Sequence, residues 1–250
     1  MSTLVIIICR QVTDKLYKQY SNCIRNYDLV FITDKPCFLP YKNIIYYDTK
    51  RTIDKNYKFM TSLTKCCAWD KCMRYMIKNN IYDYYWILED DVYINNKFET
   101  LIKEYQIKSK KSFDFLYSDW YKKYGKNKWY HWKKGVEFFK PKQLHSSINQ
   151  ICRISKNLVY LINNFRIHNK RLLFHEILLA SLCQQFQLSI SKINSPNIKL
   201  DVSAYDKHPK LSTKQKIKLC QKKHIDIMHP LKKWYLYQKT SDFIPTKSMT

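Results

Sequence analysis

Three consecutive carboxylates, Glu89-Asp90-Asp91, end an apolar and aromatic stretch that begins at Tyr84. The stretch is long enough for one buried strand, and a second short apolar run follows the acidic residues at once. Adjacent carboxylates at the end of a buried strand repel one another and lose hydration, so they need a compensating cation or open water. Hard oxygen ligands select Mg²⁺ or Mn²⁺, and these ions keep positions open for water or phosphate. The triplet therefore predicts a metal site that handles a phosphorylated ligand.

The glycine count excludes the commonest nucleotide-binding loops. The chain contains only Gly125 and Gly135. The dinucleotide-binding fingerprint and the P-loop each need several glycines within a few residues, because the backbone must approach the phosphates closely. A nucleotide bound by this protein is therefore held in another way.

Composition favours one folded domain with a basic surface. Of the 250 residues, 45% are hydrophobic and 16% aromatic, which is typical of a globular core rather than a disordered chain. The formal charge of +25 makes nucleic acid, acidic membrane surfaces and phosphorylated small molecules possible partners. The lysines are spread along the whole chain, however, and no block of them resembles a nucleic-acid-binding arm. An AT-rich coding bias explains this spread better than a dedicated function does.

The cysteines and the first residues indicate a reducing compartment. The nine cysteines are odd in number and lie mostly in apolar stretches, without a CxxC pair, so we expect free thiols and no structural zinc. Residues 1–9 lack a positively charged leader and are typical of a strand. No apolar run approaches the roughly 20 residues of a membrane span. We therefore expect a cytoplasmic protein without a membrane anchor.

Strands and helices alternate through the first half of the chain. The apolar periodicity predicts strands at 4–9, 29–33, 43–47, from 84 to the acidic triplet and at 113–118, with helices at 13–27, 60–78 and 98–105 and a polar loop at 48–57. Thr61 or Ser62 is the expected cap of the second helix. This order predicts an α/β fold with a mainly parallel sheet, in which the apolar 4–9 run is an inner strand.

The second half is less regular. Residues 119–132 interleave Trp and Tyr with lysine and fit no simple helix or strand, so they form either a stacking platform for a ligand or part of the core. A polar, lysine-rich stretch at 201–223 is typical of a mobile surface segment. The remaining predicted elements are strands at 149–154 and 188–193, a helix capped by Ser155 and a helix at 172–183.

The motif Leu88-Glu89-Asp90-Asp91-Val92, after a β-α-β beginning without a glycine loop, resembles the acidic motif of nucleotide-sugar-dependent glycosyltransferases of the GT-A fold. Those enzymes carry an Asp-any-Asp motif after a strand in the first half of the domain, and here Glu89 replaces the first Asp. The resemblance implies a Rossmann-like single domain in which Asp91 binds Mn²⁺ (or Mg²⁺), and Glu89 or Asp90 contacts the ribose or donor sugar. It also implies a third metal contact from His229 near the C-terminus.

Further site residues follow from the same resemblance. The end of the first strand, Cys9-Arg10, and Asp34 after the second strand are expected at the nucleoside, and Lys71 lies in the helix that contacts the donor. Glu176 resembles the base that removes the acceptor proton, which leads to inversion at the sugar. We expect the helix N-terminus to keep Glu176 ionised, although capping the helix is an equal alternative. Asp119 is the second candidate base.

The expected function is therefore a metal-dependent hexosyltransferase that moves a sugar from a nucleoside diphosphate, expected to be UDP, to a glycan, protein or lipid hydroxyl. The domain would span 1–232, with a nucleotide-binding half at 1–118, an acceptor-binding half at 119–232 and a tail at 233–250. A nucleic-acid-binding protein or metal-dependent nuclease is the alternative, since lysines bind phosphates and aromatics stack on bases. Against it, the carboxylates form one cluster, whereas two-metal sites draw acidic ligands from several elements. An inactive scaffold of the same fold is the third possibility.

Overall fold

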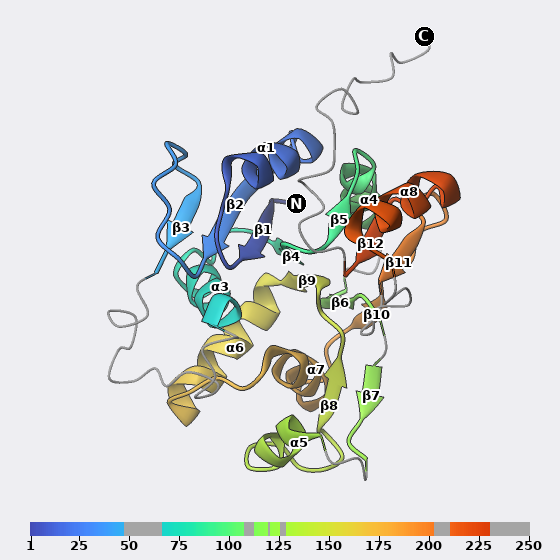
Figure 1. Ribbon diagram of the computed structural model, residues 1–250. Helices are drawn as coiled ribbons and strands as arrows, with labels where there is room; N and C mark the ends of the chain where they lie inside the picture. The colour runs from blue at the N-terminus through green and yellow to red at the C-terminus, as the bar shows by residue number, and fades with distance from the viewer. Residues whose placement is uncertain (48–66, 108–112, 120, 126–128, 203–210, 231–250) are drawn as a thin grey trace.

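Figure 1 shows a computed structural model of the chain, in which helices cover both faces of a central sheet. It describes residues 1–47, 67–107, 113–119, 121–125, 129–202 and 211–230. The expected loop at 48–57, the cap and first residues of the helix expected at 60–78, Trp120 and the tail at 233–250 lie outside these ranges.

The central sheet has seven strands in the order β10-β6-β9-β4-β1-β2-β3. Among them, β9 alone runs against its neighbours β4 and β6, and the other pairs are parallel. The strands are β1 (Thr3–Cys9), β2 (Asp28–Thr33), β3 (Ile44–Tyr46), β4 (Tyr84–Glu89), β6 (Phe115–Tyr117), β9 (Ile151–Ser155) and β10 (Ile190–Lys192). The expected α/β architecture with a mainly parallel sheet flanked by helices is confirmed.

Strand β1 is buried along its whole length between β2 and β4. Its alternate side chains feed two separate cores, with Val5 and Ile7 in one and Ile6 and Ile8 in the other. The first core also receives α1 (Asp14–Cys23), α4 (Phe98–Ile107) and α8 (Thr213–Lys223); the second receives α3 (Cys67–Lys78), α5 (Tyr130–Gly135), α6 (Lys156–Asn169) and α7 (His175–Gln185). A continuous apolar run is therefore needed, because both faces of this strand are covered.

A three-stranded sheet brings the end of the described chain back to the acidic motif. It consists of β11 (Leu200–Val202), β12 (Ile227–His229) and β5 (Tyr93–Ile94), in that order. Strand β5 begins two residues after Asp91 and pairs antiparallel with β12. This pairing brings β12 beside β5, directly after the acidic turn (Figure 1), and His229 is the last residue of β12.

Two expectations from the sequence are wrong. Residues 119–132 contain β7 (Tyr121–Lys123), which pairs with β8 (His145–Ser147), and the first turn of α5. Of the described aromatics there, Trp132 is 3% exposed and packs in the second core, and the Tyr121 hydroxyl donates to the carbonyl of Ala180 at 3.1 Å, whereas Tyr124 is 38% exposed. Strand β7 forms because it pairs with β8, since the three-residue segment Tyr-Lys-Lys has almost no strand pattern of its own.

The second wrong expectation is the mobile segment at 201–223. Its described part holds β11 and the helix α8, which begins with a capping box between Ser212 and Gln215. Ile217 and Cys220 are buried against the first core. The many lysines on the exposed side of α8 obscure this narrow apolar stripe in the sequence.

Other features of the described residues are simple. No helix there combines the length and apolar character needed to cross a membrane. The cysteines whose thiols the structure describes are free, and most are buried, namely Cys9, Cys23, Cys37, Cys72, Cys152, Cys183 and Cys220.

Helix α1 holds the acidic turn through hydrogen bonds from Tyr20. The fully buried Tyr20 donates its hydroxyl to the carbonyl of Val92 at 2.7 Å and lies 3.2 Å from the carbonyl of Glu89. The N–H of Val92 also donates to the Glu89 carbonyl, at 3.0 Å. Both ends of the turn are thus tied to one buried phenol.

Replacing Tyr20 with Phe should therefore destabilise the protein. The ring contacts remain, but two buried carbonyls lose a donor, so the free energy of unfolding should fall by about 1–2 kcal/mol. Chemical denaturation measures this change. Tyr160→Phe is the control, because Tyr160 is 57% exposed and its change should stay within about 0.5 kcal/mol. Equal stabilities for the two variants would contradict the role of Tyr20.

Candidate functional site

The acidic triplet forms a turn between β4 and β5 at the carboxyl edge of the parallel strands. The N–H of Glu89 donates to the carbonyl of Gln150 at 3.0 Å, and the N–H of Asp90 donates to the carbonyl of Ile8 at 2.9 Å. Hydrogen bonds therefore hold the turn from both sides of β4, through Gln150 next to β9 and through Ile8 of β1. In open sheets of this kind, ligands bind outside the carboxyl ends of the strands.

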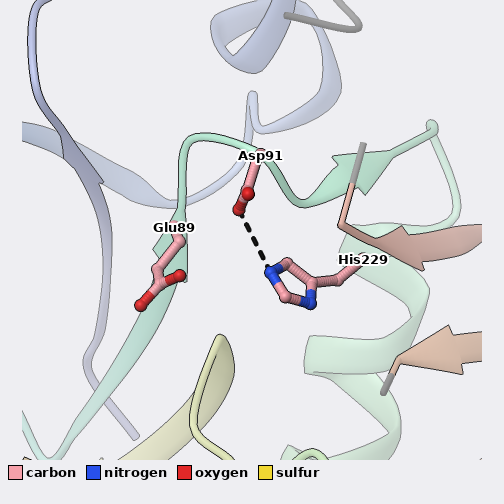
Figure 2. A group of neighbouring side chains, drawn as sticks. All are labelled: Glu89, Asp91 and His229. Carbon is pink, nitrogen blue, oxygen red and sulfur yellow. Dashed lines mark ion pairs between the residues drawn. The ribbon is translucent and has the colours of Figure 1, made fainter. Parts of the chain in front are cut away.

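Figure 2 shows two carboxylates and one imidazole gathered beside this turn. The His229 Nε2 lies 3.3 Å from the Asp91 Oδ1, and Glu89, Asp91 and His229 each offer a ligand atom within 4.8 Å of the others. Within the described ranges, this is the only such group of three or more His, Cys, Asp or Glu. The structure thus brings together Asp91 and His229, and it adds Glu89, which we expected at the ribose or sugar.

These residues fit a divalent cation. Two carboxylate oxygens and one imidazole nitrogen suit Mn²⁺ and, with water completing the shell, Mg²⁺. The Asp91 Oδ1 is buried and accepts no hydrogen bond from the described residues, apart from its ion-pair contact with His229. A buried carboxylate oxygen with so little support is the kind of ligand atom that a metal ion would satisfy.

Electrostatics also favours a cation here. Burial, followed by the Asp91 charge, raises the pKa of Glu89 to about 7, although the Trp69 hydrogen bond and His229 oppose this. Burial, followed by the Asp91 charge, raises the pKa of Asp90 to about 6. Like charges and desolvation therefore act together on the triplet, and a divalent cation would offset both.

A second group of polar residues lies at the ends of β1 and β2. The N–H of Asp34 donates to the carbonyl of Cys9 at 3.2 Å, and the Lys71 Nζ lies 3.0 Å from the Asp34 Oδ1. Lys71 is 1% exposed, and burial raises the pKa of Asp34 although Lys71 opposes this. The backbone of Arg10 holds the pKa of Asp90 down through a hydrogen bond. The four expected donor residues Arg10, Asp34, Lys71 and Asp90 thus gather at one edge of the sheet.

Glu176 lies on the other side of Glu89. Its side chain is 8% exposed, and its Oε1 is 3.5 Å from the Nε2 of Gln150, whose carbonyl accepts from the Glu89 N–H. Burial, then the charge of Glu89, raises the pKa of Glu176 to about 8. The expectation that the helix N-terminus keeps Glu176 ionised is therefore wrong, because desolvation outweighs the helix dipole. Phe174, and not Glu176, is the N-cap of α7.

Asp119 lies apart from this group, after β6. It pairs with Lys192, whose Nζ is 2.8 Å from its Oδ1. The pair lines a hollow of about 670 Å³ beside the ends of β6 and β10, together with polar residues that include Lys97, Lys199, Asn194 and Asn197. This volume is within the range of small-molecule sites, which is about 300–1,000 Å³.

Three contacts at the site had no assignment in the sequence. Tyr20 and Gln150 hold the acidic turn through its backbone, and the indole N–H of Trp69 donates to the Glu89 Oε1 at 2.9 Å. Trp69 lies in the expected donor helix, but nothing in its spacing points to Glu89. Gln150 carries no sequence signal, because its role depends on the antiparallel pairing of β9 with β4.

The family model of glycosyltransferase family 25 (LPS biosynthesis protein) matches residues 39–171, which is more than half of the chain and includes the acidic motif. No curated protein matches the chain. The family match confirms the resemblance to glycosyltransferases drawn from the acidic motif.

Several solved glycosyltransferases share part of the arrangement. The galactosyltransferase LgtC, solved with donor and acceptor sugar analogues, is 10% identical over 80% of this chain and 75% of its own, with a TM-score of 0.46. Mouse xyloside xylosyltransferase 1 is 10% identical over 91% and 97%, with a TM-score of 0.45. A glycosyltransferase involved in glycosylation of the major capsid of PBCV-1 is 10% identical over 92% of each chain, with a TM-score of 0.42. At these scores the likeness carries no functional argument.

Asp91→Asn should weaken Mn²⁺ binding by more than about tenfold, since loss of an outer-shell partner alone typically costs 10–100-fold in metal affinity. The amide preserves the shape of the side chain but removes the charge beside His229. Calorimetric titration with MnCl₂ measures the affinity. Asp28→Asn, at an exposed carboxylate on β2, is the matched control and should bind as the wild type does. An unchanged affinity in Asp91→Asn would remove Asp91 from the metal centre.

Proposed function

Since the chain belongs to glycosyltransferase family 25, we propose that it transfers a sugar from a nucleoside diphosphate, expected to be UDP, to an acceptor hydroxyl in a metal-dependent reaction. The family assignment makes the protein a glycosyltransferase. The observation that carries the finer proposal is the group formed by Glu89 and Asp91, in the partly buried acidic turn after β4, and His229 of β12.

In the proposed donor site, different residues would contact the metal ion, the phosphates and the nucleoside. Glu89, Asp91 and His229 would hold Mn²⁺ or Mg²⁺, which supplies charge to offset the departing diphosphate. Arg10 is exposed at the end of β1 and can reach toward phosphate oxygens. The buried pair of Asp34 and Lys71 offers a fixed carboxylate to the nucleoside.

The proposed acceptor side lies within 119–232. Glu176 contacts Gln150, whose carbonyl accepts from the Glu89 N–H, so the Glu176 carboxyl would lie near the reacting sugar. A general base works best with a pKa near the working pH, and a pKa of about 8 meets this condition. Removal of the acceptor proton by Glu176 would allow direct displacement with inversion. The hollow beside β6 and β10 would hold the part of the acceptor away from the reacting hydroxyl, and Asp119, which lines it, is the second candidate base.

No observation favours the nuclease alternative. Among the described residues the metal-ligand group contains two carboxylates and one histidine, and a second acidic metal group is absent there. The two-metal chemistry of nucleases uses ions about 3.5–4 Å apart, which requires more acidic ligands.

UDP should stabilise the protein against thermal unfolding in the presence of Mn²⁺, and more than GDP or CMP does, since we expect a uridine nucleotide. Arg10→Ala should weaken UDP binding about tenfold or more, because a charge-assisted hydrogen bond is worth about 1.5–3 kcal/mol. Thermal-shift titration and calorimetry measure both effects. Arg25→Ala is the matched control, since Arg25 lies just after α1 and its Nε donates to a backbone carbonyl. If Arg10→Ala binds UDP like Arg25→Ala, Arg10 is not a donor contact.

Glu176→Gln should lower sugar transfer by about 10²- to 10⁴-fold while leaving Mn²⁺ and UDP binding intact. The amide retains a polar group near Gln150 but cannot accept the proton. Wild-type turnover should also rise as the pH increases towards about 8, where Glu176 loses its proton, and the variant should lack this rise. NMR of the product with an active UDP-sugar measures rate and anomeric configuration. Glu137→Gln, at an exposed carboxylate, is the control. Retention of configuration, or full activity of Glu176→Gln, would contradict the assigned base.

A further inference from the structure

We infer that Trp69 of α3, held in place by a stack on His175 of α7, is a positioning residue that orients Glu89 for the metal ion. The inference rests on the metal centre proposed above. It concerns two residues that are not metal ligands and come from opposite sides of the acidic motif in the sequence. If the inference holds, α7, which carries the candidate base Glu176, also helps to set the orientation of the metal ligand Glu89.

The first step is the hydrogen bond to Glu89. Trp69 is 4% exposed, and its indole N–H donates to the Glu89 Oε1 at 2.9 Å. An indole has one donor and no acceptor, so this bond fixes the direction of the carboxylate without competing for its second oxygen. A glutamate has three rotatable side-chain bonds, and a donor in a buried ring selects one of its orientations before the ion arrives.

The second step is the support of the indole. The Trp69 and His175 rings are stacked, with centroids 3.9 Å apart and planes inclined by 6°. His175 is 4% exposed, and neither of its ring nitrogens has a hydrogen-bond partner among the described residues. Burial lowers the pKa of His175 well below its ordinary value, so the ring is neutral. The face of His175, rather than its nitrogens, makes the contact that the structure shows.

The third step concerns the helices that carry Trp69 and His175. Trp69 belongs to the helix that also carries Lys71, and His175 directly precedes Glu176 at the start of α7. Glu176 reaches Glu89 by a separate route, through Gln150. The first two residues of α7 therefore each contact a residue that hydrogen-bonds to Glu89: His175 stacks on Trp69, and Glu176 contacts Gln150.

A purely structural role would give a different result from a positioning role. If Trp69 only fills the core, its loss should lower stability and leave the metal affinity of the folded protein unchanged. If Trp69 orients Glu89, removal of the N–H alone should weaken metal binding even when the ring volume is largely retained. Outer-shell partners of metal ligands typically contribute 10–100-fold to affinity, so the two outcomes are easily separated.

The test compares Mn²⁺ affinity, by calorimetry, in the full-length wild type, Trp69→Phe and Trp132→Phe. Trp132 is the matched control, because it is 3% exposed and its Nε1 has no hydrogen-bond partner among the described residues. We expect Trp69→Phe to bind Mn²⁺ about 10–100-fold more weakly and Trp132→Phe to bind it as the wild type does. Near-ultraviolet circular dichroism without metal checks that each variant is folded.

A double-mutant cycle tests whether Trp69 acts through Glu89. Trp69→Phe is combined with Glu89→Gln, and the loss of Mn²⁺ affinity is measured in each background. A residue that works through Glu89 should add little once Glu89 has been replaced. Strictly additive losses would overturn the inference.

The His175 stack has its own pair of variants. His175→Phe keeps an aromatic face and loses only nitrogens without partners, so its Mn²⁺ affinity should stay near that of the wild type. His175→Ala removes the face and should weaken binding in the same direction as Trp69→Phe. Unchanged affinity in both Trp69→Phe and His175→Ala, beside a wild type that binds Mn²⁺, would overturn this inference alone. A wild type that binds no Mn²⁺ would overturn the metal centre as well.

Discussion

The repulsion among three adjacent, partly buried carboxylates at the end of β4 is the constraint on which the site depends. Burial raises the pKa of Glu89 and of Asp90, and the Asp91 charge adds to both shifts. Neighbouring side chains partly stabilise these carboxylates. The indole N–H of Trp69 donates to Glu89, and the imidazole of His229 contacts Asp91. Adjacent carboxylates of this kind are costly to bring together, and the proposed cation would offset their repulsion.

The sheet topology converts this local feature into a site. Strand β4 lies at the middle of the sheet, between β1 of the proposed nucleotide-binding half and β9 of the proposed acceptor-binding half. Its carboxyl end is thus the point where the proposed donor and acceptor groups would meet. The small sheet of β5, β12 and β11 then closes the same edge with His229, although more than a hundred residues separate this histidine from Asp91.

The same edge combines rigid and exposed groups. The pair of Lys71 and Asp34 is largely removed from solvent, so it offers fixed charges at low reorganisation cost. Arg10 stays exposed at the end of β1, and the hollow near Asp119 is open to larger ligands. This division suits the proposed reaction, in which a small charged donor would be held firmly while the bulkier acceptor varies.

The sequence alone was sufficient for the alternating α/β order, the inner position of β1 and the acidic motif after β4, because continuous apolar runs and adjacent carboxylates are local patterns. It failed at β7 and at α8, where a three-residue strand and a lysine-rich helix depend on partners distant in the chain. It also misjudged the ionisation of Glu176, since desolvation by burial cannot be read from a helix position. The resemblance implied that Asp91 and His229 share a metal, but only the tertiary structure added Glu89 to them and showed that Trp69 and Gln150 hold Glu89. Such contacts arise where β12 pairs with β5 and β9 with β4, and no spacing along the chain encodes them.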